Sequence, residues 1–472
     1  MGGGGLMQLV AYGMQDVYLT GNSQITFFKN LYRRHTNFSC EAVEQTFQSN
    51  STSFGNKLVA VISRNGDLLH RLWLEVELMP TTKSAPTDTG EVDANTNAPI
   101  TQESGACYVS KLGHALIKSA EVEIGGQRID KIYGRFTHLW HKLSCKAEKE
   151  AGYELMTAND GPDGEDCQQE SLGDHGFATR KLYIPINFFF SKGSAGAALP
   201  LIALQYHEVR VSIELASMAE VTRKWELKSN SSDAPTIKIN DGTDIPRMAS
   251  TPKLYSDFFY LDTDERRRFS QMSHEYLIEQ LQFTGAELSN TLTATEGSSF
   301  SMRLNFNHPT KAVYWTTEGA EDNDTSLNPF YNGRAVAEPA IKTLLMAGTY
   351  GMTDSNNPIA SAQLQLNGHE RFSIRDGDYF NWCQPYQHHT RVPYDHWVGM
   401  YSFCLSPEEH QPSGALNFSR IDNATLKLDF KPAGTDNFKS GATSKQRAVY
   451  VYAVNYNVLR ILSGMGGLAF SN

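Results

Sequence analysis

The chain has 472 residues, of which 40% are hydrophobic, 11% aromatic and 20% charged. This composition supplies enough apolar material for large cores and excludes disorder for most of the chain. Because β-sandwiches of about 200 to 250 residues are common, two large sandwiches are the first expectation. The formal net charge of −10 opposes counterion-release binding to nucleic acid as the main activity.

The sequence carries no membrane-spanning or secretory signal. No run of 18 apolar residues occurs, and the start at Met1 lacks the basic and apolar regions of a signal peptide. We therefore expect a cytosolic chain that does not cross a membrane. No CxxC pair occurs, so we interpret all six cysteines as reduced packing residues. They are Cys40, Cys107, Cys145, Cys167, Cys383 and Cys404.

Strict alternation of apolar and polar residues predicts half-buried antiparallel strands along most of the chain. It is clearest at residues 72–78, 209–215 and 424–430. A single helix is expected around residues 136–147, where apolar residues recur at steps of three and four. Long polar segments separate these elements and are interpreted as solvated loops on a rigid scaffold, with a functional role in some of them left open. They lie near residues 80–106, 158–175, 228–250, 318–334 and 432–446.

Weak matches in a constant order indicate an internal repeat. Val43-Glu44-Gln45 resembles Ile278-Glu279-Gln280, and Ala120–Gly126 resembles Ala362–Gly368. Further pairs are Trp73 with Trp315, Phe188 with Phe403, residues 209–215 with 424–430, and 258–266 with 452–460. A duplicated domain of eight or so strands with long loops favours a jelly roll over a domain of immunoglobulin size. The boundary is expected at the charged run of residues 262–273.

The sequence contains no established active-site pattern. No GxSxG elbow is present, and the glycine-rich segments at 193–196 and 464–467 are expected to be turns. A metal site from His388, His389, Asp395 and His396 matches no established ligand spacing, so a polar loop is the preferred interpretation. The arginines at 266–268 are expected to pair with nearby acids. Of six N-x-[ST] sequons, only Asn323 is kept as a glycosylation candidate, because it lies in a polar loop.

Several long blocks resemble the major capsid protein of nucleocytoplasmic large DNA viruses, most closely the chlorella-virus (phycodnavirus) type. These blocks run from residue 6 to 470. They include Gln8-Leu-Val-Ala-Tyr-Gly13, Asp16-Val-Tyr-Leu-Thr-Gly21, Ile62-Ser-Arg-Asn-Gly-Asp-Leu68, Ile124-Gly-Gly-Gln-Arg-Ile-Asp-Lys131, Leu304-Asn-Phe-Asn-His-Pro-Thr-Lys311, Asn417-Phe-Ser-Arg-Ile-Asp-Asn-Ala-Thr-Leu426 and Tyr456-Asn-Val-Leu-Arg-Ile461.

The resemblance implies an all-β fold, a double jelly roll of two tandem eight-stranded antiparallel β-sandwiches with long loops and few short helices. We expect an N-terminal arm at 1–24, a first jelly roll at 25–262, a linker at 263–272 and a second jelly roll at 273–472. The arm would lie on the inner face of the capsomer and present Leu6, Leu9, Tyr12 and Tyr18.

The implied function is structural: a capsid protein, not an enzyme, without a cofactor or metal. It would form a homotrimer, a pseudo-hexagonal capsomer that tiles an icosahedral shell and contacts neighbouring capsomers and minor capsid proteins. The inner face would contact an internal viral membrane, and the outer loops the host cell surface, with no direct binding of nucleic acid. We expect assembly in the host cytoplasm and a final location in the virion capsid.

Two alternatives stay open at this point. A minor capsid paralogue would share the same framework motifs. A two-domain carbohydrate-binding or carbohydrate-cleaving β-sandwich would also account for the long polar loops.

Overall fold

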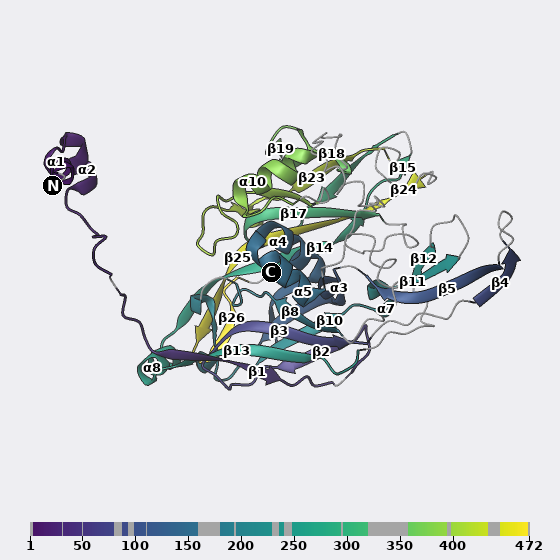
Figure 1. The fold of residues 1–472 in the computed structure, drawn as a ribbon, viewed down its shortest axis with the longest axis horizontal. Coiled ribbons are helices and arrows are strands. Elements are labelled where there is room, and N and C mark those ends of the chain that lie inside the picture. Colours follow the sequence, from purple (N-terminus) through teal and green to yellow (C-terminus); the bar gives the residue numbers. More distant parts are fainter. Residues whose placement is uncertain are drawn as a thin grey trace. The chain divides into compact units, whose positions relative to one another are not determined.

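A computed structural model describes most of the chain, in two units of residues 1–38 and 39–472. The described residues are 3–30, 32–49, 51–79, 87–92, 99–109, 111–158, 180–192, 195–228, 236–239, 248–293, 296–319, 357–393, 398–432 and 444–470. The first unit contains two short helices, α1 (Gly4–Val10) and α2 (Met14–Thr20). The second unit, which begins within strand β1, holds the sheets (Figure 1).

The first half of the second unit is a sandwich of two antiparallel sheets, here called the first roll. One sheet has the order β1-β13-β3-β8, with the short β9 beside β3, and the other has the order β2-β10-β6-β7. The strands are β1 (Phe38–Gln45), β2 (Lys57–Val61), β3 (Leu68–Leu78), β6 (Ile117–Ile124), β7 (Gln127–Tyr133), β8 (Arg180–Ile186), β9 (Leu199–Pro200), β10 (Val209–Leu215) and β13 (Lys253–Leu261).

The second half forms a second sandwich, the second roll. Its sheets have the orders β14-β25-β17-β21, with β22 and β26 attached, and β16-β23-β18-β19, with β20 attached. The strands are β14 (His274–Leu288), β16 (Ser298–Arg303), β17 (Pro309–Gly319), β18 (Ile359–Leu366), β19 (His369–Glu370), β20 (Arg375–Asp376), β21 (Val398–Ser402), β22 (Leu416–Asn417), β23 (Ala424–Phe430), β25 (Arg447–Leu462) and β26 (Met465–Leu468).

The two rolls repeat one topology. Strands β1, β13, β3 and β8 take the same places in their sheet as β14, β25, β17 and β21, and β2, β10, β6 and β7 correspond to β16, β23, β18 and β19. The matched sequence blocks fall on corresponding strands, for example Ala120–Gly126 on β6 and Ala362–Gly368 on β18. The repeat inferred from sequence is therefore a repeat of strand order, and the double jelly roll is confirmed with eight principal strands in each roll.

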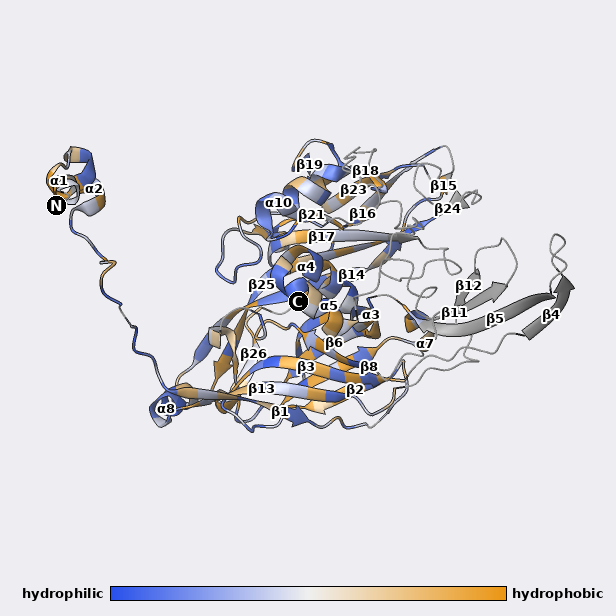
Figure 2. Ribbon diagram, viewed as in Figure 1, coloured by the Kyte–Doolittle hydropathy of each residue, from blue (hydrophilic) through white to orange (hydrophobic). Residues whose placement is uncertain are grey.

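Apolar side chains on alternate strand positions fill the cores, as the sequence pattern predicted. Leu72, Leu74 and Val76 of β3 meet Val211 and Ile213 of β10 in the core of the first roll. The core of the second roll is built in the same way, with Leu426 and Leu428 of β23 facing Val313 and Trp315 of β17. Figure 2 shows hydrophobic residues concentrated on these strands, whereas helix α8 is hydrophilic.

Further elements extend the rolls. A four-stranded sheet of order β12-β11-β5-β4 lies at one end of the second unit, and β15 pairs with β24 (Figure 1). The bounds are β4 (Thr87–Val92), β5 (Pro99–Tyr108), β11 (Thr222–Lys228), β12 (Thr236–Ile239), β15 (Leu292–Thr293) and β24 (Ser444–Lys445). The helices are α3 (Leu112–Leu116), α4 (Gly134–Ser144), α5 (Ala147–Thr157), η1 (Ala195–Ala197), η2 (Leu201–Ala203), α7 (Met218–Val221), α8 (Thr263–Gln271), η3 (Tyr379–Cys383), α10 (Gln384–His388) and η4 (Phe418–Arg420).

The helix content exceeds the single helix that the sequence pattern predicted. The stretch around residues 136–147 contains α4 and begins α5, with a break at Cys145. The charged run after Asp262 is also helical, because the Asp262 carboxylate accepts the N–H of Thr263 as an N-cap of α8. Tertiary contacts and a capping residue support these helices where apolar periodicity is weak.

The interpretation of the cysteines as packing residues holds only in part. Cys404 is buried and Cys145 is partly buried, but Cys40 and Cys383 are exposed and do not pack in a core. Cys40 lies on β1, an end strand whose side chains are mostly exposed. The side chains of Cys107 and Cys167 lie outside the described residues.

Replacing Val211 by Asp should destabilise the first roll by about 3 kcal/mol or more, because it buries an unpaired charge at a position with 0% exposure. Chemical denaturation followed by circular dichroism measures the loss. Arg210→Thr, on the exposed face of the same strand, is the control and should shift stability by about 0.5 kcal/mol or less. A Val211→Asp chain with the parental midpoint would contradict the inward facing of β10.

Candidate functional site

Three of the four predicted arm residues lie in the two helices of the first unit. Leu6 and Leu9 belong to α1, Tyr12 lies between the helices, and Tyr18 belongs to α2. Their exposed fractions are 71%, 76%, 67% and 89%, and neighbouring apolar residues such as Met14 and Phe28 are exposed as well. Apolar side chains are thus available for contacts along the whole arm.

The other candidates from the sequence lie partly within the described residues. Asn323, Asp395 and His396 lie outside the described residues. His389 uses both ring nitrogens, with Nδ1 2.8 Å from Glu408 Oε1 and Nε2 3.1 Å from the Tyr314 hydroxyl. Burial lowers the pKa of His389, although the Glu408 carboxylate favours its charged form. Within the ranges that the structure describes, no three metal-binding side chains converge.

Two of the three arginines of α8, Arg266 and Arg268, pair with acids as expected. Arg266 Nε donates to Asp67 Oδ1 at 2.9 Å, and the same carboxylate accepts the N–H of Leu261. Arg268 lies 3.8 Å from Glu265 within the helix. The run between the rolls therefore anchors to the first roll through Asp67, which is nearly buried.

The strongest candidate for a functional site is the junction between the two rolls, at which helix α4 is the central element. The helix follows β7 of the first roll and places Phe136, Leu139 and Leu143 against the second roll. They pack on the outer face of the sheet β14-β25-β17-β21, on Ala312, Tyr314, Val398, Met400, Tyr452 and Val454. Strands β17 and β25 are consequently buried on both faces.

Polar and aromatic contacts from the second roll hold α4 and α5 in place. The Trp140 ring meets Tyr314 edge-on at 6.0 Å and His389 at 5.7 Å between ring centroids. Arg391 pairs with Glu150 of α5, and its backbone N–H donates to the Leu143 carbonyl at 3.0 Å. Side-chain packing, an ion pair and a main-chain hydrogen bond thus act on the same helical pair.

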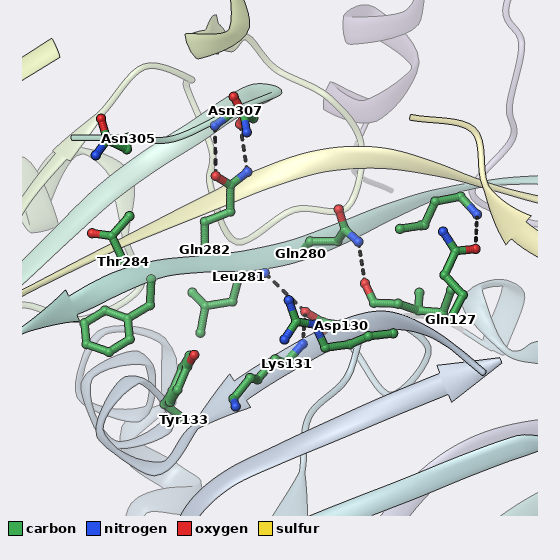
Figure 3. A pocket seen from close by; sticks show the side chains of 14 residues that line it. Gln127, Asp130, Lys131, Tyr133, Gln280, Leu281, Gln282, Thr284, Asn305 and Asn307 are labelled. Atoms are coloured by element: carbon green, nitrogen blue, oxygen red, sulfur yellow. Dashed lines mark hydrogen bonds between the residues drawn. The ribbon is translucent and has the colours of Figure 1, made fainter. Parts of the chain in front are cut away.

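Beside α4, two end strands of different sheets border a groove of about 440 Å³ (Figure 3). Gln280 donates from its amide to the Ile129 carbonyl of β7, which ties β14 to the first roll. Gln282 exchanges two hydrogen bonds with the backbone of Asn307, at 2.8 and 2.9 Å. The amides that line the groove therefore serve mainly to fasten its walls.

Asp130 lies at the base of this groove and is almost fully buried. Its Oδ1 accepts the N–H groups of Lys131 at 2.9 Å and of Leu281 at 3.2 Å, so it bridges β7 and β14. Burial raises the pKa of Asp130 to about 6, although Lys192 and the two N–H groups favour the ionised form. The Asp130 carboxylate thus binds backbone groups of both rolls.

Glu279, next to Gln280, lies close to one lysine from each roll. Lys311, with 0% side-chain exposure, lies 2.6 Å from Glu279 Oε1 and also donates to the Glu409 carbonyl at 2.8 Å. Lys192 of the first roll approaches Glu279 Oε2 at 3.8 Å and lies over the Trp140 ring at 5.2 Å. Buried charges need such partners, because an unpaired one is costly in a low-dielectric interior.

The arrangement is suited to a mechanical role: it fixes one roll against the other with apolar, polar and ionic contacts. Sequence reasoning identified the α4 region as helical but did not identify its partner on the second roll. The continuous apolar run Ala448 to Val454 in β25 was the available signal, since a strand buried on both faces loses its alternation.

Replacing Lys311 by Met should destabilise the chain by about 3–5 kcal/mol, because Glu279 would stay buried with only the more distant Lys192 and His410 nearby. Adding Glu279→Leu should recover much of this loss, since the double variant buries no unpaired carboxylate. Denaturant midpoints of the parent, single and double variants test the pair. A double variant no more stable than the single one would contradict the role of Lys311 as the counter-ion.

Comparisons with known proteins agree with this architecture. The family described as "Large eukaryotic DNA virus major capsid protein" matches residues 265–467, and the family "Major capsid protein N-terminus" matches residues 26–262. The major capsid protein of Pyramimonas orientalis virus is 42% identical, with 100% of both chains covered. That of Paramecium bursaria Chlorella virus 1 is 41% identical, with 99% of this chain and 100% of the relative covered.

Solved structures show the same fold. PBCV-1 VP54, fitted into a reconstruction of the virophage Sputnik, is 36% identical with a TM-score of 0.70, covering 95% of this chain and 100% of that one. The Faustovirus major capsid protein has a TM-score of 0.66 at 12% identity, covering 96% and 94% of the two chains. No helix in the described part of the chain is long and apolar enough to cross a membrane. With both family descriptions matched in tandem and relatives similar over their full length, the chain belongs to the major capsid proteins of large eukaryotic DNA viruses.

Proposed function

We propose that three copies of this capsid protein form a pseudo-hexagonal capsomer that tiles an icosahedral shell. The shared strand order of the two rolls carries the proposal, because three two-roll chains present six similar sandwiches around one axis. The junction at α4 supports it, since a tile with reproducible edges requires a constant angle between its rolls. The chain would act without catalysis or a cofactor.

We further propose a division of the chain into an arm at 1–24, a first roll at 25–262, a linker at 263–272 and a second roll at 273–472. The side chains of Leu459 and Ile461 lie in the core cluster of the first roll, so the C-terminal end of β25 would couple the two folding units. On this division the rolls are copies of one fold that no longer fold independently.

The arm is proposed to lie on the inner face of the capsomer, where Leu6, Leu9, Tyr12 and Tyr18 would contact minor capsid proteins or the internal membrane. Their exposure in the first unit supports a contact role. The loops between strands, including the glycosylation candidate Asn323, are proposed to face outward and contact the host cell surface. Assembly would take place in the host cytoplasm, without direct binding of nucleic acid by the capsomer.

The native mass of purified protein in mild buffer tests the capsomer. We expect a sharp species of about 158 kDa, three chains of 52.6 kDa, because the proposed capsomer contains three copies. Light scattering after gel filtration measures it directly. A monomer that persists at high concentration would count against spontaneous trimerisation, and glycan-array binding by that monomer would favour the carbohydrate-binding alternative.

Cysteine labelling of intact virions tests the proposed orientation. Tyr18→Cys should react with a membrane-impermeant maleimide only after the shell is disrupted, whereas Asn323→Cys should react in the intact particle. The parental virion gives the background from the exposed Cys40 and Cys383. Labelling of Tyr18→Cys in intact particles would contradict an inner-face arm, and the copy number of the labelled chain separates a major from a minor capsid protein.

A further inference from the structure

Three buried histidines and a tyrosine gather where the helices of the first roll meet. His114 of α3 and His138 of α4 face each other with 3.2 Å between their Nδ1 atoms. His114 Nε2 lies 2.8 Å from the Tyr153 hydroxyl of α5, and the His141 ring stacks on Tyr153 with 3.9 Å between centroids. The exposed fractions of His114, His138 and His141 are 1%, 1% and 8%.

The hydrogen bonds limit how many protons this chain of rings can hold. Between the two Nδ1 atoms there is room for one hydrogen, so one ring donates and the other accepts. The chain from Tyr153 through His114 to His138 is satisfied when both imidazoles are neutral. One additional proton can be held by either ring, whereas protonation of both rings sets two N–H groups against each other.

Charges around the cluster oppose protonation further. Lys111 at the start of α3, Lys142 of α4 and Arg391 from the second roll are cationic, while Glu150 of α5 is engaged by Arg391. Burial, followed by repulsion from a neighbouring imidazole and from Lys111 and Lys142, lowers the pKa of His114 and His138 well below the usual value, and burial lowers that of His141 to about 4.

Other titratable groups lie on the same helices and on the strands behind them. Glu154 lies within α5 and Cys145 is the C-cap of α4, and burial raises the pKa of each. Charged residues on the strands behind the helices form ion pairs of their own, namely Lys131–Glu121 at 2.6 Å, Lys118–Glu214 at 3.5 Å and Lys181–Glu75 at 3.9 Å.

Helix α4 connects this cluster to the junction. It carries His138 and His141 toward α3 and α5, while Phe136, Leu139 and Leu143 pack on the second roll. We infer that the α3–α4–α5 cluster makes the junction between the rolls acid-sensitive: proton uptake by these histidines loosens α4 and releases its grip on the second roll. The inference concerns the single chain and does not rest on the proposed trimer.

The direction in which the stability of the junction changes with pH follows from the lowered pKa values of the three histidines. An opened junction returns the imidazoles to an ordinary pKa near 6.5, so below that pH the open form binds more protons than the closed form. The stability of the junction is therefore complete above about pH 6.5 and falls as the pH approaches 4. Asp130 acts in the opposite direction, because its raised pKa favours the closed form on acidification below about 6.

Melting curves of the full-length chain between pH 7.5 and 5 test the inference. We expect the melting temperature of the parent to fall by roughly 5–10 °C, and that of His138→Gln and His141→Gln to fall by a clearly smaller amount. His369→Gln removes an exposed imidazole on β19 and should keep the parental pH slope. Variants that are folded at pH 7.5 and show the parental slope would overturn the inference.

Hydrogen exchange of the parental chain provides a readout that needs no variant. Amide protection in α3, α4 and α5, corrected for the intrinsic pH dependence of exchange, should drop at least tenfold between pH 7.5 and 5. Protection in β10 and β23, within the two cores, should change less over the same range. Equal protection of α3–α5 at both pH values would overturn the proposal even if the histidine variants failed to fold.

Discussion

The outer face of one sheet of the second roll must be covered, and the rest of the structure depends on this constraint. Tyr314, Tyr452 and Val454 would otherwise expose an apolar surface. Helix α4 of the first roll covers it, so hydrophobic burial joins the rolls at the point where the chain could otherwise bend. Strand β25 extends the effect, because its residues contribute to the second core and the α4 interface in alternation and, near its C-terminal end, to the first core.

Around this apolar contact, polar groups specify the geometry. The Asp130 carboxylate accepts N–H groups from both rolls, and Glu279 receives a lysine from each. Hydrophobic contacts tolerate sliding, whereas buried hydrogen bonds and ion pairs are lost when the partners move by about an ångström. A tile that repeats many times in a shell benefits from this combination. The apolar area holds the two rolls together, and the polar pairs fix the angle between them.

Patterns among neighbouring residues in the sequence predicted the strands well, but they predicted the junction between the rolls only in part. The inward facing of Val211 and Leu426 and the order of the repeat were predictable, because alternation and motif order are properties of neighbouring residues. The N-cap of α8 at Asp262 could also have been predicted from the sequence, although residues 263–272 were predicted only as a linker. The meeting of Asp130 with Leu281 and of His114 with His138 was not predictable, since contacts across 151 and 24 residues depend on how the sheets pack.

The repeated triads Val43-Glu44-Gln45 and Ile278-Glu279-Gln280 show what the sequence determined and what the tertiary structure decided. The sequence by itself determined that both lie on corresponding strands of a duplicated all-β fold, because alternation and order survive in each copy. Only the tertiary structure decided their roles. Glu44 stays half exposed beside Lys253, whereas Glu279 is buried between Lys311 and Lys192. The physical reason is that β14 faces the other roll: desolvation at that junction turns the same glutamate from a weak surface partner into part of a buried charge cluster.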